Sequence, residues 1–303
     1  MYIPRIQATD QQLNLRGLKT HLRVWGRADA PLLVLIHGWM DLGASFQFVV
    51  DHLQKDWRVV APDMRGFGHT AWPVSDCGGV RNYWYIDYLA DLDALLDEIS
   101  PDQPVNLVGH SMGGNIVMMY AGIRPKRVRS VVNLEGFGML DTPVEKVPSR
   151  YAAWLDQLKE PSQLRPYVNL GEVAKRLQKT NYRLSDDKAQ FLAQHWATEI
   201  APGHFKLLGD PAHRIPSPLP YRLADVQQVW SAIEVPVLHV EASETEAALW
   251  LSRAGEPVDF DEFRKRYECV KDWRFKLVEK AGHMLHHDQP QAVADLIESH
   301  VSP

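Results

Sequence analysis

The chain has 303 residues, of which 45% are hydrophobic and 23% are charged, and its net charge is −5. These proportions are typical of a soluble globular protein with a sizeable core. The absence of a basic stripe argues against a nucleic-acid partner, and no apolar stretch is long enough to span a membrane.

The compartment is predicted from the first residues and from the cysteines. The segment MYIPRIQATDQQLNL has no basic start followed by an apolar run, so no signal peptide is indicated. The only cysteines are Cys77 and Cys269, which are too few for a disulfide framework. We therefore predict a cytoplasmic protein with two plain thiols.

The first half of the chain predicts a sheet. Segments such as THLRVWG, within the first 26 residues, alternate polar and apolar residues, as antiparallel edge strands do. Short segments that are almost wholly apolar follow, which is typical of parallel strands covered by helices on both faces. These segments are PLLVLIHG (31–38), WRVVAPD (57–63), PVNLVGH (104–110) and RSVVNLE (129–135).

The remaining segments predict a helical insertion between strands of the sheet. Residues 83–100 have helical spacing, but from 138 to 225 the strand signals stop and helical segments broken by prolines take over. Strands resume at 236–242 and 273–282. We predict an α/β core domain of residues 1–137 and 226–303, with a helical cap of residues 138–225 over the carboxyl ends of the strands.

The strongest motif is LVGHSMGGN (107–115), which contains G-x-S-x-G at Gly109, Ser111 and Gly113. It follows a predicted strand and opens a predicted helix, which is the context that a nucleophile elbow requires. Glycines flank the serine because side chains would collide in so tight a turn. Ser111 is therefore the predicted nucleophile, held at a helix N-terminus.

A serine hydroxyl needs a base to take its proton, and His283 in EKAGHMLHHDQP follows the last predicted strand. His286, His287 and Asp288 are close by, but no matching ligands stand elsewhere in the sequence, so no metal is predicted. We expect the two histidines at the surface or at the rim of the pocket. Asp288 is interpreted as the N-cap of the final helix.

The oxyanion hole is predicted from the segment LIHGWMD (35–41). Trp39 and Met112 can each offer a backbone N–H, and two such donors stabilise the transition state by a few kcal/mol. His37, in the same turn, is a candidate substrate-binding residue.

These segments together resemble the α/β-hydrolase superfamily. The segments HGW (37–39), DMRGFG (63–68), GHSMGG (109–114) and AGHMLHHDQP (281–290) stand in the chain order of that superfamily and span most of the sequence. The resemblance implies an α/β-hydrolase fold with a mostly parallel central sheet, helices on both faces and a cap. It is closest to the branch of small esterases, haloalkane dehalogenases and epoxide hydrolases. The last two carry aspartate at the elbow, whereas this chain has Ser111, which favours acyl transfer.

The acid of the triad departs from the common pattern. In most relatives it is an aspartate after the strand equivalent to 236–241, but here that position holds Thr245. In a minority of relatives the acid is a glutamate after the preceding strand, where this chain has Glu135. We predict Glu135 as the acid that orients His283, with Glu244 as the alternative and Glu241 or Asp63 as weaker candidates. If Glu135 is not the acid, it is expected to pair with an arginine of the cap.

The predicted function is hydrolysis of a small-molecule carboxylic ester through an acyl-enzyme, with no cofactor. Aromatic residues of the cap are candidates for the substrate pocket, although such residues more often pack between helices: Tyr151, Trp154, Tyr167 and Trp196. The same triad could instead cleave a carbon–carbon bond, a lactone or a cyanohydrin. A receptor without activity is a further alternative. The sequence carries no signal of an oligomeric state.

Overall fold

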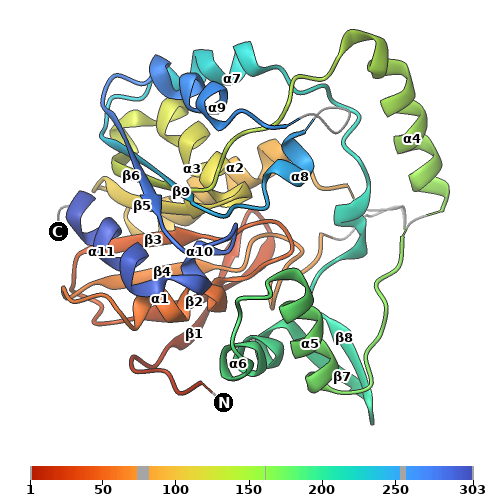
Figure 1. The fold of residues 1–303 in the computed structure, drawn as a ribbon. Coiled ribbons are helices and arrows are strands. Elements are labelled where there is room, and N and C mark those ends of the chain that lie inside the picture. Colours follow the sequence, from red (N-terminus) through yellow and green to blue (C-terminus); the bar gives the residue numbers. More distant parts are fainter. Residues whose placement is uncertain (1, 74–81, 161, 253–256, 302–303) are drawn as a thin grey trace.

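The computed structural model describes residues 2–73, 82–160, 162–252 and 257–301. Its centre is an eight-stranded sheet with the strand order β1-β2-β4-β3-β5-β6-β9-β10 (Figure 1). The strands of this sheet are β1 (Thr9–Leu15), β2 (Leu18–Trp25), β3 (Leu32–Ile36), β4 (Arg58–Pro62), β5 (Val105–His110), β6 (Val128–Leu134), β9 (Val237–Ala242) and β10 (Trp273–Val278).

The sheet is mostly parallel, as predicted. The strands from β4 to β10 in this order pair in parallel, whereas β1 and β2 form an antiparallel edge joined to β4. Every residue of the central strand β5 is buried, which is why its sequence is apolar without alternation. The parallel pairing brings the carboxyl ends of β3, β5, β6, β9 and β10 to one edge, and the predicted catalytic residues follow these strands.

Helices cover both faces of the sheet (Figure 1). One face packs against α2, α3 and α7, in a core that includes Leu92, Ile116 and Trp230, and the other packs against α1, α10 and α11. The helices are α1 (Gln47–Val50), α2 (Tyr85–Ile99), α3 (Met112–Ile123), α4 (Val147–Lys159), α5 (Leu170–Thr180), α6 (Asp186–Trp196), α7 (Leu223–Trp230), α8 (Ala248–Leu251), α9 (Phe260–Lys265), α10 (Leu285–Asp288) and α11 (Pro290–His300).

The predicted cap segment departs from a purely helical structure. It contains α4, α5 and α6, but also an antiparallel hairpin of β7 (Ala197–Ala201) and β8 (His204–Leu207), which the sequence analysis missed. The hairpin turns at Pro202 and Gly203, where glycine adopts a φ of 70°. The predicted end of the cap at residue 225 falls inside α7, and the division into core and cap stays a prediction.

Two features bear on the predicted compartment. Cys269 is a free thiol, and Cys77 lies outside the described residues. In the described part of the chain, no helix combines the length and the apolar character needed to cross a membrane.

Candidate active site

Ser111 lies in a strained turn between β5 and α3. Its φ is 52° and its ψ is −114°, a conformation that is costly for a residue with a side chain. The backbone N–H of Ser111 donates to the Leu134 carbonyl at 2.8 Å and holds the turn against β6. A Cβ at Gly109 would collide with the carbonyl of Gly113, and a Cβ at Gly113 would collide with the carbonyl of Ile36. The motif therefore forms the strand–turn–helix that its spacing predicts.

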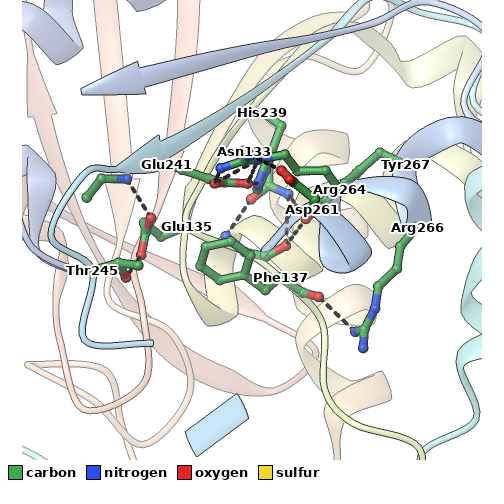
Figure 2. Close-up of polar contacts among 12 residues, drawn as sticks. Asn133, Glu135, Phe137, His239, Glu241, Thr245, Asp261, Arg264, Arg266 and Tyr267 are labelled. Carbon is green, nitrogen blue, oxygen red and sulfur yellow. Dashed lines mark hydrogen bonds and ion pairs between the residues drawn. The ribbon is translucent and has the colours of Figure 1, made fainter. Parts of the chain in front are cut away.

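Glu135 follows β6 and is held firmly in place. It has a positive φ of 57° and is buried to 2% exposure. Its backbone N–H donates to the Val240 carbonyl of β9 at 2.9 Å. The carboxylate accepts the backbone N–H of Ala242 on Oε1 at 2.7 Å, and the hydroxyl of Thr245 on Oε2 (Figure 2). A buried carboxylate requires such donors.

His283 completes this arrangement. Its Nδ1 lies 3.1 Å from Oε2 of Glu135, although the two residues are 148 positions apart in the sequence. The backbone of His283 is anchored on both sides, because its N–H donates to Glu246 at 2.7 Å and its carbonyl accepts Nε2 of His110 at 2.8 Å. In the described part of the chain no hydrogen bond engages Nε2 of His283 or links it to Ser111. The second ring nitrogen therefore stays available for the serine hydroxyl.

Glu244, the alternative acid, has a different partner. Its carboxylate lies 2.5 Å from Arg183 of the cap, and its side chain is 52% exposed. Arg183 also pairs with Glu246 at 2.8 Å, and so connects the segment between α5 and α6 to the loop of His283. Glu244 forms no contact with the imidazole among the described residues.

Glu241 and Asp63 also have structural partners of their own. Glu241 lies 2.6 Å from Arg264 and 3.1 Å from His239, in a cluster set apart from Glu135 in Figure 2. Burial acts to raise the pKa of Glu241, but the hydrogen bonds from His239 and Arg264 outweigh it and lower the pKa. Asp63 is 2.7 Å from His21 and accepts the backbone N–H of Gly43. These contacts explain how Glu241 and Asp63 are held in place, and neither carboxylate needs a catalytic role to explain its position.

The predicted oxyanion-hole donors lie at the ends of adjacent strands. Trp39 follows β3, and Met112 follows Ser111 as the first residue of α3. Among the described residues, neither backbone N–H donates a hydrogen bond within the protein. Both groups remain available to an oxygen atom near Ser111, as an oxyanion hole requires.

His37 does not face a substrate, which corrects the sequence analysis. The ring has 0% exposure, its Nδ1 lies 2.7 Å from the carbonyl of Gly38, and its Nε2 accepts the backbone N–H of Met64 at 2.9 Å. Burial lowers the pKa of His37, so the ring is neutral near pH 7. Since both nitrogens are engaged, His37 joins the loop after β3 to the loop after β4.

The cap aromatics fall into two groups. Tyr151 and Trp154 lie on α4, a helix without a buried residue; Tyr151 is 44% exposed, and Trp154 donates to Asn82 at 3.0 Å. Tyr167 belongs to the apolar cluster of the cap, and Trp196 packs against the same cluster. This cluster also includes Phe48 of α1, so Trp196 has a packing role, and only the two residues of α4 stay candidates for substrate contact.

The segment after His283 also differs from expectation. His286 and His287 are buried, with 0% and 4% exposure, rather than lying at the surface or the rim. Asp288 is not a helix cap. It accepts the backbone N–H of Gly282 at 2.8 Å and the side chain of Asn181 at 2.7 Å, so it shapes the loop that carries His283.

Two residues contribute to the site in ways that the sequence did not reveal. Thr245 stands where most relatives carry the acid, and here its hydroxyl donates to Glu135, the predicted acid. His110 precedes Ser111 and holds the carbonyl of His283. For Thr245, the only sequence signal was the missing aspartate at that position. No sequence signal identified His110.

Comparison with known proteins agrees with this architecture. A family model described as the alpha/beta hydrolase fold matches residues 31–290. The chain is 27% identical to a serine hydrolase-like protein of Danio rerio, over 93% of this chain and 84% of that protein. It is 37% identical to a 2-hydroxymuconate semialdehyde hydrolase of Pseudomonas sp. (strain CF600), over 41% of this chain and 42% of that enzyme. The thioesterase domain from the curacin biosynthetic pathway has a similar structure, with a TM-score of 0.82, 26% identity and coverage of 96% and 99% of the two chains.

Proposed function

The chain belongs to the α/β-hydrolase fold family, and we propose that it hydrolyses carboxylic esters through an acyl-enzyme on Ser111. The observation that carries this proposal is the 3.1 Å contact between Nδ1 of His283 and the buried carboxylate of Glu135. That contact leaves the opposite ring nitrogen to act on a serine held in a strained turn. The similarity to a serine hydrolase-like protein supports the same reading.

The proposed mechanism uses each group at a stated atom. Nε2 of His283 takes the hydroxyl proton as Ser111 attacks the acyl carbon, and Glu135 stabilises the imidazolium through Nδ1. The backbone N–H groups of Trp39 and Met112 donate hydrogen bonds to the developing oxyanion. His283 then protonates the leaving alcohol, and a water molecule activated by the same ring releases the acid. The serine–histidine hydrogen bond is expected to tighten when substrate binds.

A panel of p-nitrophenyl esters with short, medium and long acyl chains tests this proposal. We expect turnover of at least one ester, together with covalent labelling of Ser111 by a fluorophosphonate probe. Labelling without turnover of any ester would reject the ester specificity but retain the serine mechanism. Failure of both would favour a receptor that binds a small molecule without chemistry.

Carbon–carbon bond hydrolysis is the second candidate. It is favoured by the 37% identity to a 2-hydroxymuconate semialdehyde hydrolase, although that match spans 42% of that enzyme. The same Ser111, His283 and Glu135 would serve, but the bond that breaks would join two carbon atoms, and the leaving carbanion would take the proton from His283. A vinylogous diketone added to the ester panel distinguishes the two, because the preferred substrate has the higher kcat/KM.

Thr245 is predicted to act as a positioning residue for the acid. The near-isosteric change Thr245→Val removes the hydroxyl that donates to Oε2 of Glu135. We expect kcat to fall by about tenfold with KM nearly unchanged, because the lost hydrogen bond to a charged group orients the carboxylate rather than the substrate. Thr245→Ser restores the hydroxyl and should restore kcat. An equal loss in both variants would indicate a packing role of the threonine instead.

The α4 aromatics are predicted to influence substrate choice. We expect Trp154→Ala to change the ranking of KM across acyl chain lengths by several-fold, with fluorophosphonate labelling of Ser111 intact. Trp196→Ala is the matched comparison, because Trp196 packs against the apolar cluster of the cap. It should lower the melting temperature instead, as loss of a large packed ring does. If Trp154→Ala lowers activity uniformly on all esters, α4 does not contact the acyl group.

The partner is a small-molecule ester, and the proposed chemistry routes no step through a cofactor. A cytoplasmic location remains a prediction from the cysteine content, and fractionation of the source cells would test it.

A further inference from the structure

Three buried side chains that take no part in the proposed chemical steps form a cluster, and one of them, His110, directly precedes Ser111 in the chain. Asp41 comes from the loop after β3, His110 is the last residue of β5, and His286 lies on α10. Each offers one metal-binding atom, and these atoms all lie within 4.8 Å of one another. The three residues are buried to 4%, 1% and 0% exposure. The sequence analysis predicted no metal because these residues are far apart in the chain.

Each of the three residues carries a buried polar atom without a hydrogen-bond partner among the described residues. These atoms are Oδ1 of Asp41, Nδ1 of His110 and Nδ1 of His286. A buried polar atom left without a partner is costly, so each of the three requires an explanation. A bound ion or water molecule would supply the missing partner.

The hydrogen bond of His110 prepares that ring for a metal. Its Nε2 lies 2.8 Å from the carbonyl of His283, and a carbonyl can only accept, so the proton is on Nε2. In the neutral ring Nδ1 then presents its lone pair. Histidines that bind metals are commonly oriented in this way by a backbone carbonyl on the other nitrogen. A Cβ at position 38 would come within 3.0 Å of Nδ1 of His110, so Gly38 keeps the space beside this atom open.

The charge of Asp41 also favours a cation. Oδ2 accepts the hydroxyl of Ser45 at 2.8 Å and lies 3.7 Å from Nε2 of His286. No lysine or arginine of the described ranges pairs with it. A buried carboxylate with one hydrogen bond and no fixed cation is costly. A divalent cation held jointly with two imidazoles would compensate this charge.

We propose that Asp41, His110 and His286 bind one divalent transition-metal ion of the Zn²⁺ class. Two imidazoles and a carboxylate match the ligands of Zn²⁺, whereas Mg²⁺ and Ca²⁺ prefer oxygen ligands alone. A tetrahedral site brings ligand atoms to about 3.3 Å from one another, so binding draws the three side chains together. The site joins the loop of Trp39, the strand that precedes Ser111 and the loop of His283. The ion therefore stabilises the arrangement of the active site rather than entering the reaction.

The test measures metal binding directly and needs no substrate, so it stands apart from the proposed ester specificity. The untagged, chelator-treated protein is titrated with Co²⁺, and visible d–d absorption is recorded, followed by competition with Zn²⁺. We expect one ion per chain, with absorption typical of a tetrahedral site. Zn²⁺ in excess should also raise the melting temperature by on the order of 5 °C, because the ion binds only the folded chain.

Matched variants assign the site. Asp41→Asn keeps the shape of the side chain, and an amide is cheaper to bury than a charge, so this variant should fold without metal. We expect Asp41→Asn and His286→Gln to lose the Co²⁺ absorption and the Zn²⁺-dependent stabilisation. His204→Gln, at an exposed histidine outside the cluster, should keep both. The proposal is overturned if the wild type binds no ion, or if Asp41→Asn binds it as the wild type does.

Discussion

Ser111→Ala is expected to lower kcat on p-nitrophenyl esters by on the order of 10⁶-fold while the protein folds normally. The substitution removes the hydroxyl, but the hydrogen bond from the backbone of residue 111 to the Leu134 carbonyl can still form. The remaining activity, roughly 10³-fold over the uncatalysed reaction, reflects the oxyanion hole and substrate binding. Steady-state kinetics beside a thermal melt measure both effects.

Labelling provides the control for this prediction. The wild type should react with a fluorophosphonate probe and the alanine variant should not, at equal melting temperature. Turnover by Ser111→Ala close to that of the wild type would reject the serine mechanism. Loss of activity together with loss of the folded state would leave the hydroxyl untested, so Ser111→Cys serves as a second variant. It retains a nucleophile at the same place and should react with a thiol-directed alkylating probe such as iodoacetamide.

Glu135→Gln is expected to lower kcat by about 10⁴-fold. The backbone N–H of Ala242 donates to Oε1, so a glutamine would place its carbonyl there and its amide NH₂ where Oε2 now faces His283. An amide N–H directed at Nδ1 favours the tautomer with the proton on Nε2, which cannot accept a proton from Ser111. The melting temperature should change by only about 3 °C or less, because a neutral amide is easier to bury than a charge.

Glu244→Gln is the matched control, because it makes the same chemical change at the alternative acid. Glu244 is half-exposed and paired with Arg183, and exposed ion pairs contribute about 0–1 kcal/mol. We expect kcat to stay within about twofold of the wild type. If Glu244→Gln were inactive and Glu135→Gln active, the acid would follow β9 and the contact of Glu135 with His283 would be structural only.

The contact between the acid and the base illustrates how far a sequence can predict a site. The elbow is readable because its chemistry is local: glycines flank Ser111 within five residues and the strand and helix adjoin it. The acid is different, since Glu135 and His283 are 148 residues apart. The sequence could only name four carboxylates, and the order of strands β6 and β9 decided which of them meets the imidazole.

His286 shows that residues adjacent in the sequence can have different surroundings in the folded protein. Read along the chain, it belongs with His287 and Asp288; the helix start was the interpretation of Asp288, and the two histidines were expected at the surface or at the rim of the pocket. In the folded protein Asp288 accepts hydrogen bonds from Gly282 and Asn181, whereas His286 lies with Asp41 and His110. The direction in which a side chain of a short helix points depends on packing, and the sequence pattern does not predict that direction.

The sequence by itself predicted the parallel sheet and a candidate nucleophile and base, because each depends on residue types and spacing over a few neighbouring positions. The tertiary structure decided what depends on distance in space. It placed Thr245 on the carboxylate of Glu135, buried His37 between two backbone groups, and added the hairpin of β7 and β8 to the cap. The physical reason is that hydrogen bonds and burial act over a few ångströms, and only the folded chain brings residues of distant strands within that range.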